Sequence, residues 1–533
     1  MNKKAICAFA GALACALAFT GCSGGGSRSL ATVKKTTPDT YPIQTDETVT
    51  YWVELSGHVS AHSQSLNDTE FAKNLIKETG INVEFVHPAI GQEKEQFNLM
   101  IASGDLPDII ESGWFTYAGG PEKAISEGTI LPLNQIIDTV SPNIKKLFDE
   151  HPDYKKNVMS DKGNIYAYPF VRGDEILQTY IGPMVREDLL EKHNLEKPET
   201  IAEWETMLRA FKSDGIKAPL VVKLDNKTMD GVSPIVGAFG IGGTFYVDNG
   251  KVKYGPYEPA YKEFVTLMAR WYSEGLLDSN FADVDGKRIT SLMANGDGGS
   301  AFGSAGGDFG KWIPALEVKN PDAKFVPVKY PVMNKGDRPQ FGQKLFPVEG
   351  SGAAISGMSK NVELAARLLD YGYSEKGHML YNFGKENESY TMNGDVPTYT
   401  DVIMDSDKNG GLGIGPAMGK YIRACYNGPF VQDVNYLNQF YAIPQQLEAV
   451  NVWSDTDMLG HKMPFSPLTQ EENREYTKIM QDIDTYRQEV LYKTISGTSS
   501  LAEFETYFSE MKDRGIERAI EIQQAAYDRY LAN

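Results

Sequence analysis

Cys22 is the residue whose chemistry the surrounding sequence indicates most directly. Two lysines near the start precede a mostly apolar, uncharged run over residues 5–19, and Ser23 with three glycines follows the cysteine. A basic start, an apolar core and small residues before a cleavage point are typical of an export signal, not of a membrane-spanning helix. A small residue before cysteine, with a flexible tail behind it, is the bacterial lipobox pattern, in which the thiol receives diacylglycerol. We therefore expect removal of residues 1–21 and a lipid anchor on Cys22 at the extracellular face of the bacterial cell membrane. The alternative is an ordinary signal peptide that happens to contain a cysteine.

The rest of the chain carries no clear catalytic or metal-binding motif. It has no P-loop, no Cys-x-x-Cys and no His-Glu-x-x-His. Residues 298–302 approximate a nucleophile elbow but lack its last glycine. Residues 405–410 match the opening half of a calcium loop, but Pro416 stands where the bidentate glutamate is needed. We therefore expect neither a metal ion nor a cofactor, and residues 405–410 are interpreted as a polar surface turn.

Polar and aromatic side chains follow two predicted strands at the point where each strand ends. In open α/β sheets, ligand crevices lie outside the carboxyl ends of the strands. The residues placed there are Glu54, Ser56 and His58 after the first strand and Trp114, Phe115 and Tyr117 after the third. We expect Trp114 to be exposed to a bound solute. The alternatives are a Trp114 packed on a neighbouring loop and a His58 hydrogen-bonded within its own loop.

Strands and helices alternate in the sequence that must position these residues. Apolar periodicity, a capping box at residues 67–70 and glycine stop signals predict an alternation of strand and helix. The predicted elements are strand 48–55, helix 67–80, strand 81–86, helix 93–102 and strand 108–110. This βαβαβ order is typical of a parallel sheet covered by helices.

The later sequence repeats this pattern less regularly. A second capping box at Thr200–Glu203 precedes a helix, another helix is predicted over residues 261–271, and the last hundred residues are mostly helical. We therefore expect an α/β protein of two lobes with an extra helical region at the C-terminus.

Composition restricts the partners. After loss of residues 1–21, Cys425 is the only cysteine besides the anchor, so no internal disulfide can form in the body. The cut removes two of the 52 basic side chains and none of the 71 acidic ones, which leaves a net charge of about −21. Such a charge argues against nucleic acid and against electrostatic adhesion to anionic lipid. Residues 22–45 are interpreted as a flexible tether, so we expect membrane contact through the lipid anchor only.

Short characteristic segments are spread from about residue 48 to the C-terminus. The segments are ETGINVEF at 78–85, IASGDLPDI at 101–109, GNIYAYP at 163–169, VREDLL at 185–190, SEGLLD at 273–278, YSEKG at 373–377, NFGKENESY at 382–390 and AAYDRY at 525–530. Singly they are short, but in this order they resemble the large extracellular solute-binding lipoproteins of ABC importers. Many relatives carry an acidic calcium loop after the helix that corresponds to residues 204–211, and this sequence has few carboxylates there.

The resemblance implies a two-lobe fold of the periplasmic-binding type II class, with strands linking the lobes. The expected boundaries are 46–170 for the first part of lobe 1, 171–335 for the first part of lobe 2, 336–410 for a return to lobe 1, and 411–533 for the helical end of lobe 2. It also implies a monomer that captures an oligosaccharide or similar solute, by closing around it, for the permease subunits of an ABC transporter. A secreted glycosidase remains an alternative because paired carboxylates leave no spacing motif. A carbohydrate-binding adhesin is another.

A sugar-binding cleft requires flat aromatic rings for the apolar C–H faces and polar groups for the hydroxyls. Beyond the residues after the two strands, the further candidates are Tyr168, Arg172, Phe302, Ser304, Trp312, Glu349, Glu386, Glu388, Tyr390 and Trp453. For Arg172, two roles stay open: a bidentate contact to an anionic or hydroxyl-rich ligand, or an ion pair with Asp174 or Glu175. The glycine-rich stretch 295–310 either lets the backbone approach a ligand closely or forms a flexible lid.

Overall fold

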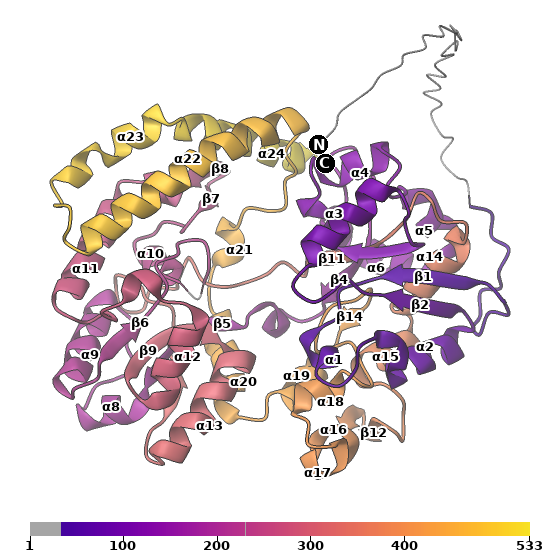
Figure 1. Cartoon of the computed structure of the whole chain (residues 1–533), viewed down its shortest axis with the longest axis horizontal. Helices are drawn as coiled ribbons and strands as arrows, with labels where there is room; N and C mark the ends of the chain where they lie inside the picture. The colour runs from indigo at the N-terminus through magenta and orange to yellow at the C-terminus, as the bar shows by residue number, and fades with distance from the viewer. Residues whose placement is uncertain (1–32, 230, 533) are drawn as a thin grey trace, which may run out of the picture. The chain divides into compact units, whose positions relative to one another are not determined.

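The βαβαβ alternation at the start of the chain builds the parallel part of a six-stranded sheet (Figure 1). The computed structural model describes residues 33–229 and 231–532. In the first sheet, β1 (Thr48–Trp52) pairs in parallel with β2 (Asn82–Val86) on one side and β3 (Ile109–Ser112) on the other. The five elements predicted for this region are therefore confirmed. One detail differs, because Thr69, not Asn67, caps α2 (Glu70–Thr79) by accepting the Ala72 N–H at 3.2 Å.

Three later strands complete this sheet from distant parts of the chain. Its order is β14-β4-β11-β3-β1-β2, with β4 (Tyr168–Arg172), β11 (Val348–Ile355) and β14 (Val431–Gln432). Because β11 is antiparallel to both β3 and β4, the carboxyl ends of β1, β3, β4 and β14 lie at one edge of the sheet. That edge is where a ligand crevice is expected in such a fold.

Helices cover both faces of the six-stranded sheet. In Figure 1, α3 (Glu93–Ser103) and α4 (Gly120–Ser126) lie above the sheet and α2 lies below it with α15 (Glu375–Phe383). The rings of Phe71 on α2 and Tyr381 on α15 are 4.9 Å apart. A further group packs together, namely α5 (Asn134–Val140), α6 (Pro142–Glu150) and α14 (Val362–Tyr371).

The second lobe is built on a four-stranded sheet of order β10-β5-β9-β6. The strands are β5 (Ile181–Arg186), β6 (Ala218–Val221), β9 (Gly298–Ser304) and β10 (Phe325–Pro327). Its helices include α9 (Ile201–Ser213), α11 (Ala260–Ser273), α12 (Gly286–Asn295) and α13 (Gly310–Lys319). The capping box predicted at Thr200–Glu203 is present with both hydrogen bonds, and Trp204 and Trp271 fill the core of this lobe.

The C-terminal region is helical, as expected, and packs on the second lobe. It consists of α22 (Gln470–Ile495), α23 (Tyr507–Asp513) and α24 (Ile516–Ala532). Helix α22 packs against α11 and α24, and α24 contacts β8 (Lys251–Tyr254), which forms a hairpin with β7 (Phe245–Asp248) (Figure 1). None of the helices in the described part of the chain is long and apolar enough to cross a bilayer.

Three segments of the described chain cross between the two sheets: 173–180, 328–347 and 433–443. Gln343 ties the first two together, since its Oε1 accepts the Tyr180 N–H at 2.6 Å and its Nε2 donates to the Gln178 carbonyl at 3.1 Å. The Leu345 N–H donates to the same Gln178 carbonyl at 2.9 Å. The crossing segments thus hold one another while they connect the lobes.

The lobe boundaries differ from the expected ones near residue 410. Strand β14 belongs to the first sheet, and α18 (Ile414–Met418) contacts α1 (Gly57–Ser60) of the first lobe. The chain therefore enters the second lobe through α19 (Val434–Phe440) and α20 (Pro444–Ser454), later than expected. A two-residue strand has no periodicity to detect, which is why the sequence did not indicate it.

Residues 33–45 also differ from the expected flexible tether, because they pack along the first lobe. The Thr37 N–H donates to Glu363 at 2.7 Å, and Arg367 donates to the Asp39 carbonyl at 2.8 Å. The Tyr41 hydroxyl donates to the Arg367 carbonyl at 2.7 Å, and Ile43 is buried. Composition suggested disorder here, but these hydrogen bonds and the side chains of Tyr41 and Ile43 fix the segment on the first lobe. Residues 22–32, and with them Cys22, lie outside the described residues.

Candidate functional site

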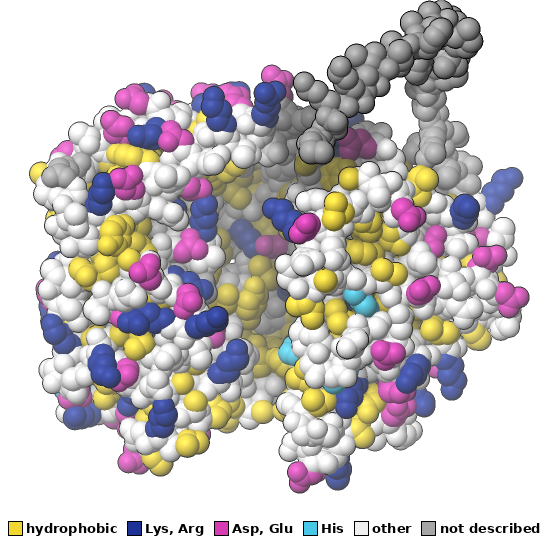
Figure 2. All heavy atoms as spheres, in the orientation of Figure 1, with side chains coloured by type: hydrophobic (Ala, Val, Ile, Leu, Met, Phe, Trp, Pro, Cys, Tyr) yellow, Lys and Arg dark blue, Asp and Glu magenta, His cyan; other side chains and the backbone are white. Residues whose placement is uncertain are grey.

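A cavity of about 620 Å³ opens between the two lobes, at the carboxyl ends of β4, β14 and β9. Arg172 and Gln432 reach it from the first sheet and Ser304 from the second. Figure 2 shows the surface hollowed between the two lobes, with charged side chains spread over the outer surfaces. The site follows from the strand order, since each of these residues ends its strand.

Aromatic rings on α19 and just after it form one wall of the cavity. Tyr436 and Phe440 are one helical turn apart and stack with their ring centroids 5.6 Å apart, and Tyr441 lies 5.5 Å from Phe440. The i, i+4 spacing places the first two rings on one helix face. A row of rings of this kind offers flat apolar surface to a ligand.

Glycines in the turn after β9 make room for these rings. A methyl group on Gly306 would lie 3.3 Å from Tyr441 Cε1 and 3.4 Å from Phe440 Cε1, so a side chain there would press on both rings. Gln446 of α20 fixes this turn by donating to the carbonyls of Ala305 and Gly306 at 2.9 and 3.3 Å. The glycine-rich stretch is therefore a buried strand followed by one π-helical turn (Ala305–Phe309), and not a flexible lid.

Arg172 brings a positive charge into the cavity. Its guanidinium donates to the Glu349 carbonyl at 3.1 Å and lies 5.0 Å from the centroid of the Phe170 ring. Burial lowers the pKa of Arg172 from its ordinary value. Neither expected ion-pair partner reaches it, because Asp174 accepts the Ile176 N–H at 3.0 Å and Glu175 pairs with Lys344 at 3.2 Å.

His58 and Ser304 also line the cavity, but their surroundings restrict what they can do. Burial lowers the pKa of His58, and its ring meets Phe440 edge-on at 6.2 Å, so the imidazole acts as a neutral packing group near pH 7. Ser304 donates its N–H and its hydroxyl to Asp308 at 2.7 and 2.9 Å. Neither residue has the base or nucleophile geometry of a catalytic site among the described residues.

Three of the predicted site residues therefore meet in this cavity: His58, Arg172 and Ser304. Phe115 and Glu349 line a second cavity of about 320 Å³, between the first lobe and residues 462–466. There the Glu349 carboxylate pairs with Lys462 at 2.6 Å. Glu386 and Tyr390 line a third hollow of about 380 Å³ on the first lobe, next to Glu388, which pairs with Lys385 at 3.0 Å.

Five predicted aromatic residues lie in the core and reach none of these cavities. Their side chains have 0–1% exposure, and they are Trp114, Tyr168, Phe302, Trp312 and Trp453. The expectation that Trp114 faces a solute is thereby corrected: its indole N–H donates to the Ile110 carbonyl at 3.3 Å and its ring packs on Phe97. The same reason applies to Trp453, which donates to the Pro183 carbonyl at 3.3 Å, and to Phe302, which stacks on Trp204.

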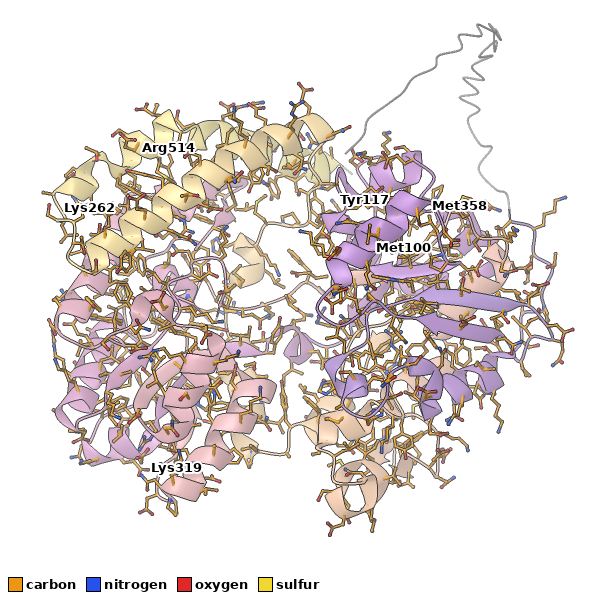
Figure 3. All side chains as sticks on the ribbon, viewed as in Figure 1. Met100, Tyr117, Lys262, Lys319, Met358 and Arg514 are labelled. Atoms are coloured by element: carbon orange, nitrogen blue, oxygen red, sulfur yellow. The ribbon has the colours of Figure 1, made fainter. Side chains whose placement is uncertain are left out.

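The remaining predicted residues lie outside the main cavity, and two of them have local structural partners. Tyr117, labelled on the first lobe in Figure 3, donates its hydroxyl to Glu127 at 2.9 Å. Ser56 caps α1 by accepting the Val59 N–H at 3.4 Å. Glu54 is exposed, and its side chain lies outside the main cavity.

The sequence-based prediction missed most of the cavity wall between residues 413 and 446. The residues missed are Tyr426, Asn427, Gln432, Tyr436, Phe440, Tyr441 and Gln446. Two tyrosines and a phenylalanine within six residues at 436–441 could have indicated a ring-lined binding surface. The expected boundaries instead place this segment in the helical end of lobe 2.

The turn at residues 405–410 makes local contacts. Asp405 caps the short helix α17 (Ser406–Asn409), and Lys408 pairs with Asp401 and, at 3.7 Å, with Asp405. In the described part of the chain, no three His, Cys, Asp or Glu side chains gather in a way that suits a metal ion.

Known proteins share both sequence and fold with this chain. A family model described as bacterial extracellular solute-binding protein matches residues 64–379, more than half of the chain. The chain is 25% identical over 522 residues to the fructooligosaccharide ABC transporter substrate-binding protein FusA of Streptococcus pneumoniae serotype 4. The alignment covers 93% of this chain and 92% of FusA. It is 22% identical over 343 residues to lipoprotein LipO of Bacillus subtilis strain 168, or 61% of this chain and 65% of LipO.

Solved structures give the same result for the fold. Alginate-binding protein AlgQ2, in a crystal structure without calcium ion, superimposes with a TM-score of 0.69 at 26% identity, over 93% of this chain and 100% of that one. An HMO-binding, ABC-transporter-associated solute-binding protein from Bifidobacterium longum infantis gives 0.72 at 20% identity, over 91% and 99%. The expected two-lobe α/β fold is confirmed.

Proposed function

Because the chain belongs to the family of bacterial extracellular solute-binding proteins, we propose that it captures an oligosaccharide between its lobes and delivers it to the permease of an ABC transporter. The observation that carries this proposal is the cavity of about 620 Å³ with walls from both sheets. The relative FusA, whose alignment covers 93% of this chain, is named as a fructooligosaccharide-binding protein, and this supports an oligosaccharide as the ligand.

The cavity offers what an oligosaccharide requires. The rings of Tyr436, Phe440 and Tyr441 supply apolar faces for the C–H groups of a pyranose or furanose. Arg172 and Asn427, which also line the cavity, supply polar groups for hydroxyls. A volume of about 620 Å³ is within the range of sites that enclose a small ligand.

Binding in such a place favours closure of the lobes. A solute that contacts both sheets interacts more strongly with a closed form than with an open one, so it shifts the equilibrium by that difference in affinity. The crossing segments at 173–180, 328–347 and 433–443 are the positions at which the backbone would bend.

We place the protein on the extracellular face of the cell membrane, as a monomer that Cys22 anchors through its lipid. The resemblance to lipoprotein LipO supports the anchor. In this proposal the protein binds its solute and releases it without cleaving any bond.

A thermal-shift screen of the full chain, against neutral and acidic oligosaccharides with peptides as the comparison class, tests the proposal. A ligand at 100 times its Kd stabilises the folded state by about 2.7 kcal/mol, which raises the melting temperature measurably. Stabilisation by an oligosaccharide, without new reducing ends in the same sample, is the expected result. Stabilisation by peptides alone, or the appearance of reducing ends, would contradict it.

A further inference from the structure

Arg172 is the only permanently charged residue among the described residues that line the cavity between the lobes. No aspartate or glutamate of the described part of the chain shares that lining, although the full sequence has 71 acidic side chains. The nearby carboxylates are engaged elsewhere: Asp174 with the Ile176 N–H, Glu175 with Lys344, and Glu349 with Lys462. The cavity therefore has a net positive charge.

Two fully buried arginines of this protein, Arg423 and Arg367, have more hydrogen-bond partners than the partly buried Arg172. Arg423 donates to both carboxylate oxygens of Glu111, at 3.0 and 3.2 Å. Arg367 donates to three backbone carbonyls, those of Val140, Pro38 and Asp39, at 3.2, 3.0 and 2.8 Å. Arg172 makes one such bond, to the Glu349 carbonyl at 3.1 Å, within the described residues. Burying a cation without compensation is costly, and the lowered pKa of Arg172 has the same cause.

The opposite wall carries a weaker positive potential of its own. Helix α20 spans 11 residues, and Ile443 and Gln446 at its N-terminal end line the cavity. The N-terminal end of a helix of this length carries a partial positive charge. Together with Arg172 it makes the space between the lobes attractive to an anion, in a chain with a net charge of −19.

We infer that the captured oligosaccharide carries a carboxylate and that Arg172 receives this carboxylate. The inference rests on the proposed function and specifies its substrate class. A guanidinium and a carboxylate form two parallel N–H···O bonds, which would use the donors that Arg172 leaves free. A neutral sugar, in contrast, would offer these donors only hydroxyl oxygens, which accept a hydrogen bond less strongly than a carboxylate does.

The test compares acidic oligosaccharides with neutral counterparts of the same shape on the full chain by calorimetry. The probes are short oligomers of galacturonate, mannuronate and glucuronate, and sialyllactose, each paired with the same sugar whose carboxyl groups have been reduced to primary alcohols. The expected result is that the acidic member binds at least about 30-fold more tightly than its reduced partner, as for a buried charge pair that loses one partner. Arg172→Gln should abolish the difference between the two, whereas Arg338→Gln should keep it, because Arg338 is exposed and pairs with Asp455 at 3.0 Å on the surface.

The outcomes separate this inference from the proposed function. Equal or tighter binding of the reduced sugars to the unaltered protein overturns the inference and leaves oligosaccharide capture intact. Binding of no oligosaccharide of either kind overturns both. If Arg172→Gln does not fold, the paired measurement on the unaltered protein decides the question. Arg172→Lys then serves as the variant, because it keeps the positive charge but loses the two parallel N–H donors of the guanidinium.

Discussion

At the scale of single residues, the structure assigns large aromatic side chains to two different tasks. All six tryptophans are buried: Trp52, Trp114, Trp204, Trp271, Trp312 and Trp453. The rings that line the cavity are tyrosines and phenylalanines, among them Tyr436, Phe440 and Tyr441. Residue type alone, which favoured tryptophan for stacking on sugars, therefore selected core residues. Position after the first strand found His58, whereas Arg172 and Ser304 were candidates because of their polar side chains near the lobe crossing and in the glycine-rich stretch.

Gly306→Val should weaken ligand binding about fivefold or more, because the added side chain displaces the rings that line the cavity and overpacking a tight space costs about 1–3 kcal/mol. The added side chain would meet Tyr441 and Phe440, at 3.3 and 3.4 Å already for the first carbon. Titration calorimetry measures the affinity. Gly286→Val is the matched control, because nothing lies within 4 Å of the carbon it adds. Unchanged affinity in the folded Gly306→Val protein would remove this turn from the binding site.

Asp370 gives a pH dependence of stability. Burial raises the pKa of this carboxyl from 3.8 to about 6, although it accepts the backbone N–H groups of Asn143 and Ile144. The folded protein then holds a proton that the unfolded chain releases, so the contribution is present below about pH 4 and is lost as pH rises through about 6. The free energy of unfolding should therefore fall by about 3 kcal/mol from this group between pH 4 and 7.

Urea unfolding at pH 4, 5, 6 and 7 measures that fall as the difference between the unaltered protein and Asp370→Asn. The exposed Asp322→Asn serves as the control and should follow the unaltered protein. Parallel curves for the unaltered protein and Asp370→Asn would show that the carboxyl does not titrate in this window.

At the scale of elements, a buried ion pair fixes the segment 411–432, which stays in the first lobe. Glu111 on β3 accepts from Arg423 and, at 2.5 Å, from the Tyr51 hydroxyl on β1. Glu111 is 5% exposed and Arg423 is 1% exposed, so each charge depends on the other. This triad links strands β1 and β3 to the loop before β14 and thereby positions Tyr426 and Gln432 at the cavity.

Glu111→Gln should destabilise the protein by about 3–5 kcal/mol, because it leaves the Arg423 charge buried without a carboxylate. Glu111→Gln with Arg423→Met should recover part of that loss. Denaturant unfolding measures both, and Asp455→Asn, which breaks the exposed pair with Arg338, should change stability by less than about 1 kcal/mol. A small effect of Glu111→Gln would mean that water or another group compensates Arg423.

How much of the arrangement could be read from the sequence depended on the range of the interaction. The first five elements were predictable because caps, glycine stops and apolar periodicity are local, as in α2 with its end at Gly80. Strand β14 was not, since a two-residue strand is created by its pairing with β4 and not by its own sequence. The same holds for residues 33–45, where Glu363, more than 300 positions away, supplies the hydrogen bonds.

At the scale of the whole molecule, a negative body requires something other than charge to stay at a membrane. Cys22→Ala should abolish incorporation of labelled palmitate and release the protein into the medium. Cys425→Ala should keep both the label and the membrane fraction, because burial raises the pKa of the Cys425 thiol to about 12 and leaves it unreactive. Retention of Cys22→Ala on the cells, with the label lost, would indicate a second means of attachment.

In the proposed function, closure of the lobes is the step that converts binding into a signal for a permease. The walls of the cavity come from both sheets, and in the described chain only three segments cross from one sheet to the other. A ligand that contacts Arg172 on one side and the turn at Gly306 on the other therefore stabilises the closed form. Small-angle scattering of the full chain should show a smaller radius of gyration with saturating oligosaccharide than without it. At a ligand concentration near the Kd of the unaltered protein, Gly306→Val should scatter more like the free protein than the unaltered protein does. An unchanged radius for the unaltered protein, with binding verified by calorimetry in the same buffer, would mean that the solute is held without closure and that the permease recognises something other than a closed form.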